Sequence, residues 1–327
     1  MNKKAIIAMS GGVDSSVAAY LLKHSGWDCV GATMTLYRNE DIGISRSRTC
    51  CSLEDVEDAR SVAFRLRIPY YVFNFSDEFR RQVMDRFADA YGQGRTPNPC
   101  IDCNRYLKFR HLYDRAVLLG CDAIATGHYA RIERENGRYL LKKALDASKD
   151  QSYVLYMLTQ KQLALTQFPL GALRKAETRQ LADSLGFFNA RKPDSQDICF
   201  VPDGDYAAFI RRHTGKADAP GDFVDESGRI LGRHKGIAHY TIGQRKGLGI
   251  PSSQPLYVKA IDPKSNQVVL SENDALFSRQ LTGENFKWIA WEAPPRQFRC
   301  SAKIRYRQTE QPCKVTVEEN GSVQVRF

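Results

Sequence analysis

The sequence has no apolar run approaching the roughly 20 residues that a membrane-spanning helix requires. Its first four residues, Met-Asn-Lys-Lys, lead directly into a short apolar stretch and lack the pattern of a secretory signal peptide. Internal repeats and low-complexity tracts are absent as well. These absences argue against a membrane protein and a repeat protein, and we expect a cytoplasmic protein without a membrane partner.

Two common phosphate-binding signatures are missing from the glycine-rich stretch near the N-terminus. No Lys follows Gly11 and Gly12, and the dinucleotide fingerprint G-x-G-x-x-G does not occur there. Instead, an apolar strand candidate at 5–9 is followed by Ser-Gly-Gly-Val-Asp-Ser-Ser and by apolar residues at helical spacing from Val13 onward. This order predicts an anion site, because backbone N–H groups and the helix dipole both favour negative charge.

The segment Ser-Gly-Gly-x-Asp-Ser in this setting resembles the pyrophosphate loop of ATP pyrophosphatases. Such enzymes cleave ATP between the α and β phosphates and transfer AMP to an oxygen. Asp14 beside the anion site would repel phosphate, which implies an intervening Mg²⁺. The alternative is an ordinary strand–helix turn capped by Ser or Asp.

Composition allows two or three domains with real cores, since the chain has 327 residues, of which 43% are hydrophobic. The formal net charge of +11 fits a polyanionic partner. The charge is spread out, because residues 201–327 carry 19 Lys and Arg against 14 Asp and Glu. Charge therefore favours a nucleic acid partner only slightly.

Up to about residue 200 the pattern alternates between strand and helix, which predicts an α/β fold with a doubly wound parallel sheet. Ligands of such sheets lie at the carboxyl ends of the strands, so 10–14, Met34 and 127–128 should surround one crevice. Beyond about residue 205 short β-like runs alternate with turns, and the last of them predict a hairpin around Asn320-Gly321. The expected strands are 29–34, 70–75 and 122–128, and the expected helices are 53–66, 77–91 and 106–119, with 92–104 as a loop.

Nine cysteines in a cytoplasmic chain favour thiols, metal ligands or catalysts over structural disulfides. Cys100 and Cys103 form a C-x-x-C motif, whose spacing suits redox exchange or metal binding. We expect a helix N-terminus and nearby basic residues to lower the pKa of Cys103. Buried, apolar roles are expected for the four cysteines Cys29, Cys121, Cys300 and Cys313, and the adjacent pair Cys50-Cys51 is unexplained.

Beside an ATP pyrophosphatase loop, C-x-x-C suggests that sulfur is moved. Adenylation would turn a carbonyl oxygen into a good leaving group. A persulfide on one cysteine would attack the activated carbon, and a second thiol would cleave the S–S bond and leave a disulfide. This scheme needs two cysteines from separate segments.

Seven motifs extend across essentially the whole chain: SGGVDSS, TPNP…CN…KF, ATGHYA, KDQSYVLY, DSQDICF, YTIGQRKGLGI and IRYRQ. In these motifs and their order the chain resembles the MnmA family, the tRNA-specific 2-thiouridylases. The resemblance implies ATP-dependent formation of 2-thiouridine at the wobble position of tRNAs for Lys, Glu and Gln. It also implies a sulfur donor, such as a cysteine desulfurase or a sulfur-relay protein. Three parts are implied: an ATP pyrophosphatase domain (1–204), a small central domain (205–270) and a C-terminal β-barrel (271–327).

The resemblance also implies roles for single residues. Cys103 would be the nucleophile and Cys199 the persulfide carrier. The ATP-binding residues would be Ala8, Met9, Ser10, Gly11, Gly12, Val13, Asp14, Ser15, Met34 and Gly127, with Asp14 holding Mg²⁺ through ATP. The tRNA-binding residues would be Asn98, Pro99, Cys100, His128, Lys149, Asp150, Gln151, Arg305 and Tyr306.

The sequence departs from the family pattern at two places. Many members have Asp where Cys100 stands, an acid assigned to proton transfer, and Asp102 is a candidate replacement. Cys100, Cys103 and Cys199 give three thiols, and relatives with this pattern are proposed to hold a [4Fe–4S] cluster, so spacing leaves persulfide and cluster both open. Relatives also continue past Phe327, and we therefore expect an incomplete C-terminal barrel.

Two functions of other classes remain alternatives. Amidating ligases such as GMP and NAD synthetases share the pyrophosphate loop, but they need ammonia and no cysteine pair. A non-catalytic RNA-binding protein on the same fold is the second alternative, but RNA binding alone does not require an intact loop at 10–16.

Overall fold

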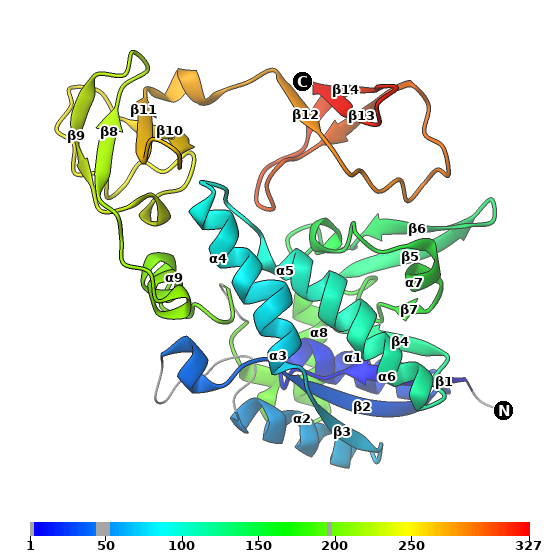
Figure 1. Cartoon of the computed structure of the whole chain (residues 1–327). Helices are drawn as coiled ribbons and strands as arrows, with labels where there is room; N and C mark the ends of the chain where they lie inside the picture. Colours follow the sequence, from blue (N-terminus) through cyan, green and yellow to red (C-terminus); the bar gives the residue numbers. More distant parts are fainter. Residues whose placement is uncertain (1–2, 44–52, 195–197) are drawn as a thin grey trace. The chain divides into compact units, whose positions relative to one another are not determined.

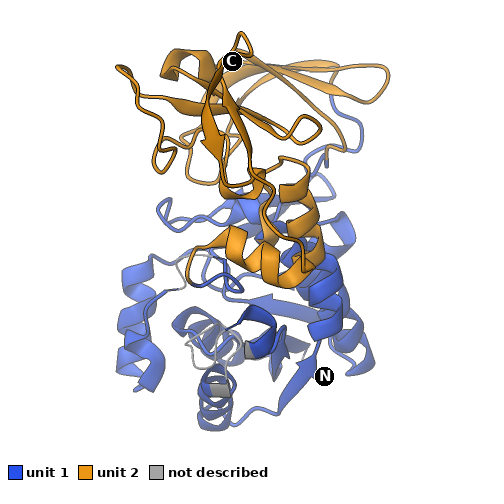
Figure 2. Ribbon diagram, turned by 60° about the vertical axis from the view of Figure 1, so that its left-hand side comes forward, with its two compact units in different colours: residues 1–82, 100–202, 287–294 blue, residues 83–99, 203–286, 295–327 orange. Residues whose placement is uncertain are grey.

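The computed structural model describes residues 3–43, 53–194 and 198–327, and Figure 1 traces the chain. Cys50 and Cys51 lie outside the described residues. The chain divides into two compact units, coloured separately in Figure 2. Unit 1 comprises 1–82, 100–202 and 287–294, and unit 2 comprises 83–99, 203–286 and 295–327. Over the described ranges, no helix has both the length and the apolar character needed to cross a membrane.

Unit 1 is built on a five-stranded sheet in the order β3-β2-β1-β4-β7, and every neighbouring pair is parallel (Figure 1). Residues Ala5 to Ala8 of β1 are buried, as expected of a central strand with both faces covered. The predicted parallel sheet is thus confirmed. The strands are β1 (Lys4–Ala8), β2 (Asp28–Thr35), β3 (Tyr70–Asn74), β4 (Ala123–Thr126) and β7 (Thr166–Gln167).

Helices cover the sheet because alternate side chains of its strands point to opposite faces. Ala5 and Ile7 of β1 join a core with α1 (Val13–His24), α2 (Leu53–Arg65) and α8 (Lys175–Ser184), whereas the equally buried Ile6 lies outside that core. The other elements of unit 1 are η1 (Asn39–Ile42), α3 (Ser76–Phe79), α5 (Pro99–Asp102), the π-helical η3 (Cys103–His111), α6 (Leu112–Leu118), the hairpin β5 (Ala130–Glu135) and β6 (Arg138–Lys143), η4 (Ser152–Val154), α7 (Gln160–Ala164) and η5 (Phe188–Arg191).

Unit 2 contains two four-stranded sheets in the orders β10-β11-β8-β9 and β12-β15-β14-β13. β14 and β15 pair antiparallel around Asn320-Gly321, which confirms the predicted hairpin. The π-helical η2 (Arg80–Met84) leads from α3 into unit 2. The elements of unit 2 are α4 (Asp85–Gly92), α9 (Tyr206–Thr214), β8 (Gly221–Val224), β9 (Ile230–His234), η6 (Ile237–His239), β10 (Tyr257–Asp262), β11 (Gln267–Ser271), η7 (Asn273–Leu276), β12 (Gln280–Gly283), β13 (Gln297–Ala302), β14 (Gln311–Val317) and β15 (Val323–Arg326).

One local prediction was wrong. The expected loop 92–104 is helical from Pro99 onward, where proline occupies the first helical position, a place that needs no N–H donor. Helix α9 adds a helix to the region expected to be β-rich. Its Asp205 side chain accepts a hydrogen bond from Ala208 N at 2.9 Å, and Gly215 ends it at φ 70°, so both capping signals were present in the sequence.

Candidate active site

Hydrogen bonds from residues distant in the sequence fix the loop between β1 and α1. The Asn189 side chain donates hydrogen bonds of 2.9 Å to Gly11 O and to the Ser16 hydroxyl. Thr33 Oγ1 donates to Met9 O at 2.6 Å. Gly12 is the N-cap of α1 and brings no side-chain acceptor to the first helical turn. The N–H groups of that turn therefore remain suited to an anionic ligand, as expected for the predicted nucleotide site.

Glycines let the strands approach this loop closely. A Cβ atom at Gly127, just after β4, would lie 2.7 Å from Ser15 N and 2.8 Å from the Asp14 carbonyl carbon. Gly11 has φ +74°, and a Cβ there would lie 2.4 Å from Asp55 O. The ends of β1 and β4 thus meet at the start of α1. Met34 lies near the end of β2, the strand that pairs with β1 on the side opposite β4.

We expect Gly127→Ala to displace the first turn of α1, because the clashing atoms are backbone atoms that cannot rotate away. Overpacking of this kind costs about 1–3 kcal/mol of unfolding free energy. ATP affinity should fall by roughly tenfold or more, which is about 1.4 kcal/mol or more. Chemical unfolding and calorimetric ATP titration measure the two effects. The matched control is Gly92→Ala, whose Cβ meets nothing within 4 Å, and equal behaviour of the two variants would contradict this role of Gly127.

The Asp14 carboxylate is the centre of a charged cluster that the sequence did not reveal. Both of its oxygens accept hydrogen bonds of 2.7 Å from Lys175 Nζ, and the Tyr129 hydroxyl donates to Oδ1 at 2.9 Å. Lys175 also pairs with Asp194 at 2.7 Å and is buried, with 11% of its side chain exposed. Lys149 and Arg179 complete the cluster by pairing with Asp194. No motif of a single sequence pairs residues 161 positions apart, which is why Lys175 was missed.

Burial and hydrogen bonding both shift the pKa values of the groups in this cluster. Burial alone would raise the pKa of Asp194, but hydrogen bonds from Lys149 and Lys175 outweigh it and lower the pKa to about 2. Burial and the Asp14 charge raise the pKa of the Tyr129 hydroxyl, which therefore stays a neutral donor. Asp14 and Asp194 offer the carboxylate oxygens that Mg²⁺ prefers, and Lys175 provides positive charge at the same place.

The residues expected to touch tRNA between β4 and η4 have internal partners. His128 is buried, with 7% of its surface exposed, and its ring contacts the rings of Phe109 and Phe168. The Asp150 carboxylate accepts from Ala144 N at 3.0 Å, and the Gln151 side chain accepts from Tyr129 N at 2.9 Å. The contacts of these residues with tRNA stay a prediction. The hydrogen bonds of Asp150 and Gln151 position the backbone at Ala144 and Tyr129.

Cys103 begins η3 after the full turn of α5, rather than at the first residue of a helix. Burial raises the pKa of its thiol to about 11, although the charge of Lys108 acts in the opposite direction. The expectation of a lowered pKa was therefore wrong, because desolvation outweighs the nearby cations. Asp102 ends α5 immediately before Cys103, and its role in proton transfer stays a prediction.

We expect the alkylation of Cys103 by iodoacetamide to rise about tenfold per pH unit between pH 7 and 9, because only the thiolate reacts. A pKa near 11 makes the thiolate fraction at pH 8 on the order of 100-fold smaller than that of an ordinary cysteine. Peptide mass spectrometry measures the rate at this residue, and the denatured chain is the control. A plateau below pH 9 in the folded protein would contradict the raised pKa.

Cys199 is anchored through its backbone, since the Tyr37 hydroxyl donates to Cys199 O at 2.7 Å. Tyr37 packs on Phe79, which packs edge-on against Phe200, so the 199–200 segment is fixed beside the residues that follow β2. The seven cysteines within the described ranges are thiols and form no disulfide. Over the same ranges, no three His, Cys, Asp or Glu side chains form a group able to hold a metal ion. The use of Cys100, Cys103 and Cys199 in a persulfide or a cluster mechanism stays a prediction.

The other cysteines follow the expectation of burial only in part. Cys29 and Cys313 are buried, as predicted. Cys121 is half-buried and Cys300 is exposed, so the prediction was wrong for these two. Cys300 lies on β13, which is an edge strand of its sheet and has only one neighbouring strand to cover it.

The remaining residues predicted to contact tRNA lie at two places, in the loop between β13 and β14 and at the start of α5. Arg305 and Tyr306 stand in the loop between β13 and β14, where Arg305 donates to Ile242 O at 2.9 Å and Tyr306 is exposed. Asn98 directly precedes α5, whose first residue Pro99 is buried and whose second, Cys100, is exposed. The structure thus leaves Tyr306 and Cys100 accessible.

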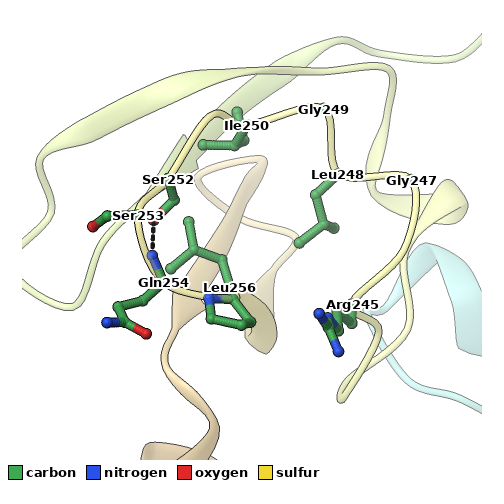
Figure 3. Close-up of a pocket in the computed structure, with 10 residues that line it drawn as sticks. Arg245, Gly247, Leu248, Gly249, Ile250, Ser252, Ser253, Gln254 and Leu256 are labelled. Carbon is green, nitrogen blue, oxygen red and sulfur yellow. Dashed lines mark hydrogen bonds between the residues drawn. The ribbon is translucent and has the colours of Figure 1, made fainter.

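A separate pocket of about 360 Å³ lies within the segment 245–256 of unit 2. Figure 3 shows Leu248, Ile250 and Leu256 around it, with Arg245 to one side. The pocket falls in the YTIGQRKGLGI region, and none of the predicted nucleotide-binding residues lines it. The predicted nucleotide site at the loop before α1 therefore does not include this pocket.

Comparisons with known proteins cover the whole chain. Residues 3–203 match the family model described as tRNA methyl transferase HUP domain. Residues 207–272 match tRNA methyl transferase PRC-barrel domain, and residues 278–327 match Aminomethyltransferase beta-barrel domain. A parallel-sheet domain followed by a PRC-barrel and a C-terminal β-barrel domain agrees with the predicted fold class. The exact boundaries at 204 and 270 stay a prediction.

Solved structures resemble the chain more weakly. A 4-thiouridine synthetase in complex with RNA and ATP is 22% identical with a TM-score of 0.42, and the match covers 61% of this chain and 45% of that one. NMN synthetase from Francisella tularensis is 17% identical with a TM-score of 0.38, covering 67% and 79%.

Curated relatives match along the full length. The tRNA-specific 2-thiouridylase MnmA 1 of Thermoanaerobacter sp. (strain X514) is 51% identical over 100% of this chain and 90% of its own. The tRNA-specific 2-thiouridylase MnmA of Clostridioides difficile (strain 630) is 48% identical over 100% of this chain and 91% of its own. With such identity over nearly the entire length of both sequences, this chain belongs to the MnmA family of tRNA-specific 2-thiouridylases.

Proposed function

We propose that the protein converts the wobble uridine of tRNA to 2-thiouridine in an ATP-dependent reaction. The observation that carries this proposal is the uncapped first turn of α1 beside the Asp14–Lys175 pair, in a chain of the MnmA family. The tRNAs for Lys, Glu and Gln are the proposed substrates. Because ATP and tRNA are the substrates, we place the activity in the cytoplasm.

Activation would take place at the loop before α1. The N–H groups of the first helical turn would hold the pyrophosphate of ATP, and Lys175 would add positive charge beside them. Mg²⁺, held by Asp14, would neutralise phosphate charge. The O2 atom of uridine would attack the α-phosphorus, so that pyrophosphate leaves and C2 carries an AMP leaving group. Gly127 and Asn189 position the loop for this step.

Sulfur transfer would follow on the two cysteines. The terminal sulfur of a Cys199 persulfide would attack C2 and expel AMP, giving a disulfide between Cys199 and the nucleoside. The Cys103 thiolate would then attack the Cys199 sulfur, which forms a Cys103–Cys199 disulfide and releases 2-thiouridine. The transferred sulfur is reduced and the two cysteines are oxidised, so an external thiol must reduce them before the next turnover. A raised pKa for Cys103 means that this thiol must lose its proton during the reaction.

We favour the persulfide over a [4Fe–4S] cluster. A cluster on Cys100, Cys103 and Cys199 would need all three thiols as iron ligands. The persulfide needs only Cys103 and Cys199, together with a persulfide donor such as a cysteine desulfurase or a sulfur-relay protein.

Pyrophosphate release tests this function against its alternatives. We expect the purified chain to release pyrophosphate from ATP when a tRNA with uridine at position 34 is added, and to release little with the same tRNA carrying cytidine there. Ammonia and a free nucleotide should not replace tRNA. Release that depends on ammonia and a nucleotide would support an amidating ligase, and no release under any condition would support a non-catalytic RNA-binding protein.

A further inference from the structure

Two cysteines of the C-terminal sheet face each other across neighbouring strands. β13 and β14, labelled in Figure 1, pair antiparallel with Cys300 directly opposite Cys313. Their Sγ atoms lie 3.5 Å apart. Directly opposed residues of an antiparallel pair point to the same face, so the two side chains meet without any change in register. The proposed sulfur transfer uses neither of them.

The two thiols differ in access. Cys313 is buried, as is Val315 two residues further along β14, whereas Cys300 is exposed. An external reagent can therefore reach Cys300 first, and Cys313 is already in position to react with whatever Cys300 has bound. A disulfide has an S–S bond of about 2.05 Å, so the sulfurs need to approach by roughly 1.5 Å from their separation of 3.5 Å, a movement that side-chain rotation can provide.

A bond between these cysteines would close the base of the loop that joins the two strands. That loop, residues 303–310, is held at present by hydrogen bonds: Lys303 Nζ donates to Tyr306 O at 3.4 Å, and Arg305 Nη2 donates to Ile242 O at 2.9 Å. A cross-link from 300 to 313 would enclose the whole loop in a covalent ring and reduce the freedom of its ends.

We propose that Cys300 and Cys313 form a reversible dithiol–disulfide site that is oxidised by low-molecular-weight disulfides of the glutathione type and that fastens the loop 303–310. The Cys300 thiolate attacks one sulfur of the small disulfide, forming a mixed disulfide and releasing one thiolate. The Cys313 thiolate then attacks the Cys300 sulfur and releases the second thiolate. Two electrons pass to the small disulfide, and the two protons lost by the cysteines end on the released thiolates. A small thiol reverses both steps.

Partial desolvation by its neighbours raises the pKa of the Cys300 thiol to about 11, and its hydrogen bond to Cys313 acts in the same direction. The thiolate is therefore scarce at neutral pH, and the first exchange step should accelerate as the pH rises. Oxidation is best tested at pH 8 or above with incubation to equilibrium.

The test is disulfide mapping on the full chain. The reduced protein is equilibrated with mixtures of oxidised and reduced glutathione, alkylated, digested without reduction and analysed by mass spectrometry. We expect a peptide pair joined through Cys300 and Cys313 to predominate in excess oxidised glutathione and to vanish when reduced glutathione is restored. Tryptic cleavage after Arg305 should then leave the two halves joined until a reductant is added.

Two variants make the outcome decisive. Cys300→Ala should abolish the joined peptides, and Cys313→Ala should accumulate the mixed disulfide of Cys300 with glutathione. Mapping by peptide separates this pair from any Cys103–Cys199 disulfide, so the result does not depend on the proposed reaction. The proposal is overturned if the wild-type chain at equilibrium carries only the mixed disulfide on Cys300, or if both cysteines stay thiols while the exposed Cys100 has reacted.

Discussion

Asp14→Ala should lower tRNA-dependent pyrophosphate formation by about 10²- to 10³-fold, the size of effect seen when one preorganised charge-stabilising group is removed. Asp14 anchors Lys175 through both carboxylate oxygens at 2.7 Å and is the residue proposed to hold Mg²⁺. Its loss would remove the proposed Mg²⁺ contact and one of the two carboxylates that hold Lys175 at the start of α1. Release of radiolabelled pyrophosphate from ATP in the presence of tRNA measures the effect.

The fold should survive this substitution, because Lys175 keeps its ion pair with Asp194 at 2.7 Å and is not left buried without a partner. Asp77→Ala, which removes an exposed carboxylate of the same unit, serves as the control and should retain the wild-type rate. Thermal unfolding of both variants checks the fold. Pyrophosphate formation at the wild-type rate in a folded Asp14→Ala protein would disprove the assignment of this loop to ATP.

Cys199→Ser should leave pyrophosphate formation intact in a single turnover and reduce 2-thiouridine to undetectable levels. Serine cannot carry a persulfide, whereas the activation step uses the loop before α1 and does not need this thiol. Nucleoside mass spectrometry and pyrophosphate release on the same sample separate the two steps. Cys121→Ser, at a half-buried cysteine outside the proposed reaction, is the matched control.

Cys103→Ser sharpens the same test. Without the resolving thiol, the disulfide between Cys199 and the nucleoside should persist, and a protein–tRNA adduct should accumulate that dissociates on adding a reductant. Formation of 2-thiouridine at the wild-type rate in Cys199→Ser would show that another group carries the sulfur. Absence of the adduct in a Cys103→Ser protein that still activates tRNA would contradict the order of the two thiols.

The sequence allowed the parallel sheet to be predicted because its signals are local. The apolar run at β1, the glycine turn and the apolar spacing of α1 lie within 24 residues, and the alternation of strands and helices fixes a parallel topology. The C-terminal hairpin likewise follows from one Asn-Gly turn.

The charged cluster around Asp14 could not be predicted in this way. Six strands, β2 to β7, lie between Asp14 and Lys175 in the chain, and the helix of Lys175 reads as an ordinary amphipathic segment in the sequence. The Cys103 pKa was misjudged for a related reason. Neighbouring cations are visible in the sequence, but the burial that outweighs them depends on tertiary packing.

Cys300 and Cys313 show the same limit in the C-terminal sheet. Alternation with apolar residues suggested that both were buried, but only the strand register reveals that they face each other and that one is exposed. Thirteen positions separate them, so their pairing depends on the length of the loop between β13 and β14.

The central claim, that this chain thiolates the wobble uridine of tRNA, is tested most directly by nucleoside mass spectrometry of a reconstituted reaction. The purified chain is incubated with an unmodified tRNA for Glu, ATP, Mg²⁺ and a persulfide donor, and the tRNA is digested to nucleosides. We predict 2-thiouridine in an amount that depends on ATP and on Cys199, and none with a tRNA that lacks uridine at position 34. The absence of 2-thiouridine from a reaction in which pyrophosphate is released, or its appearance without ATP, would contradict the account.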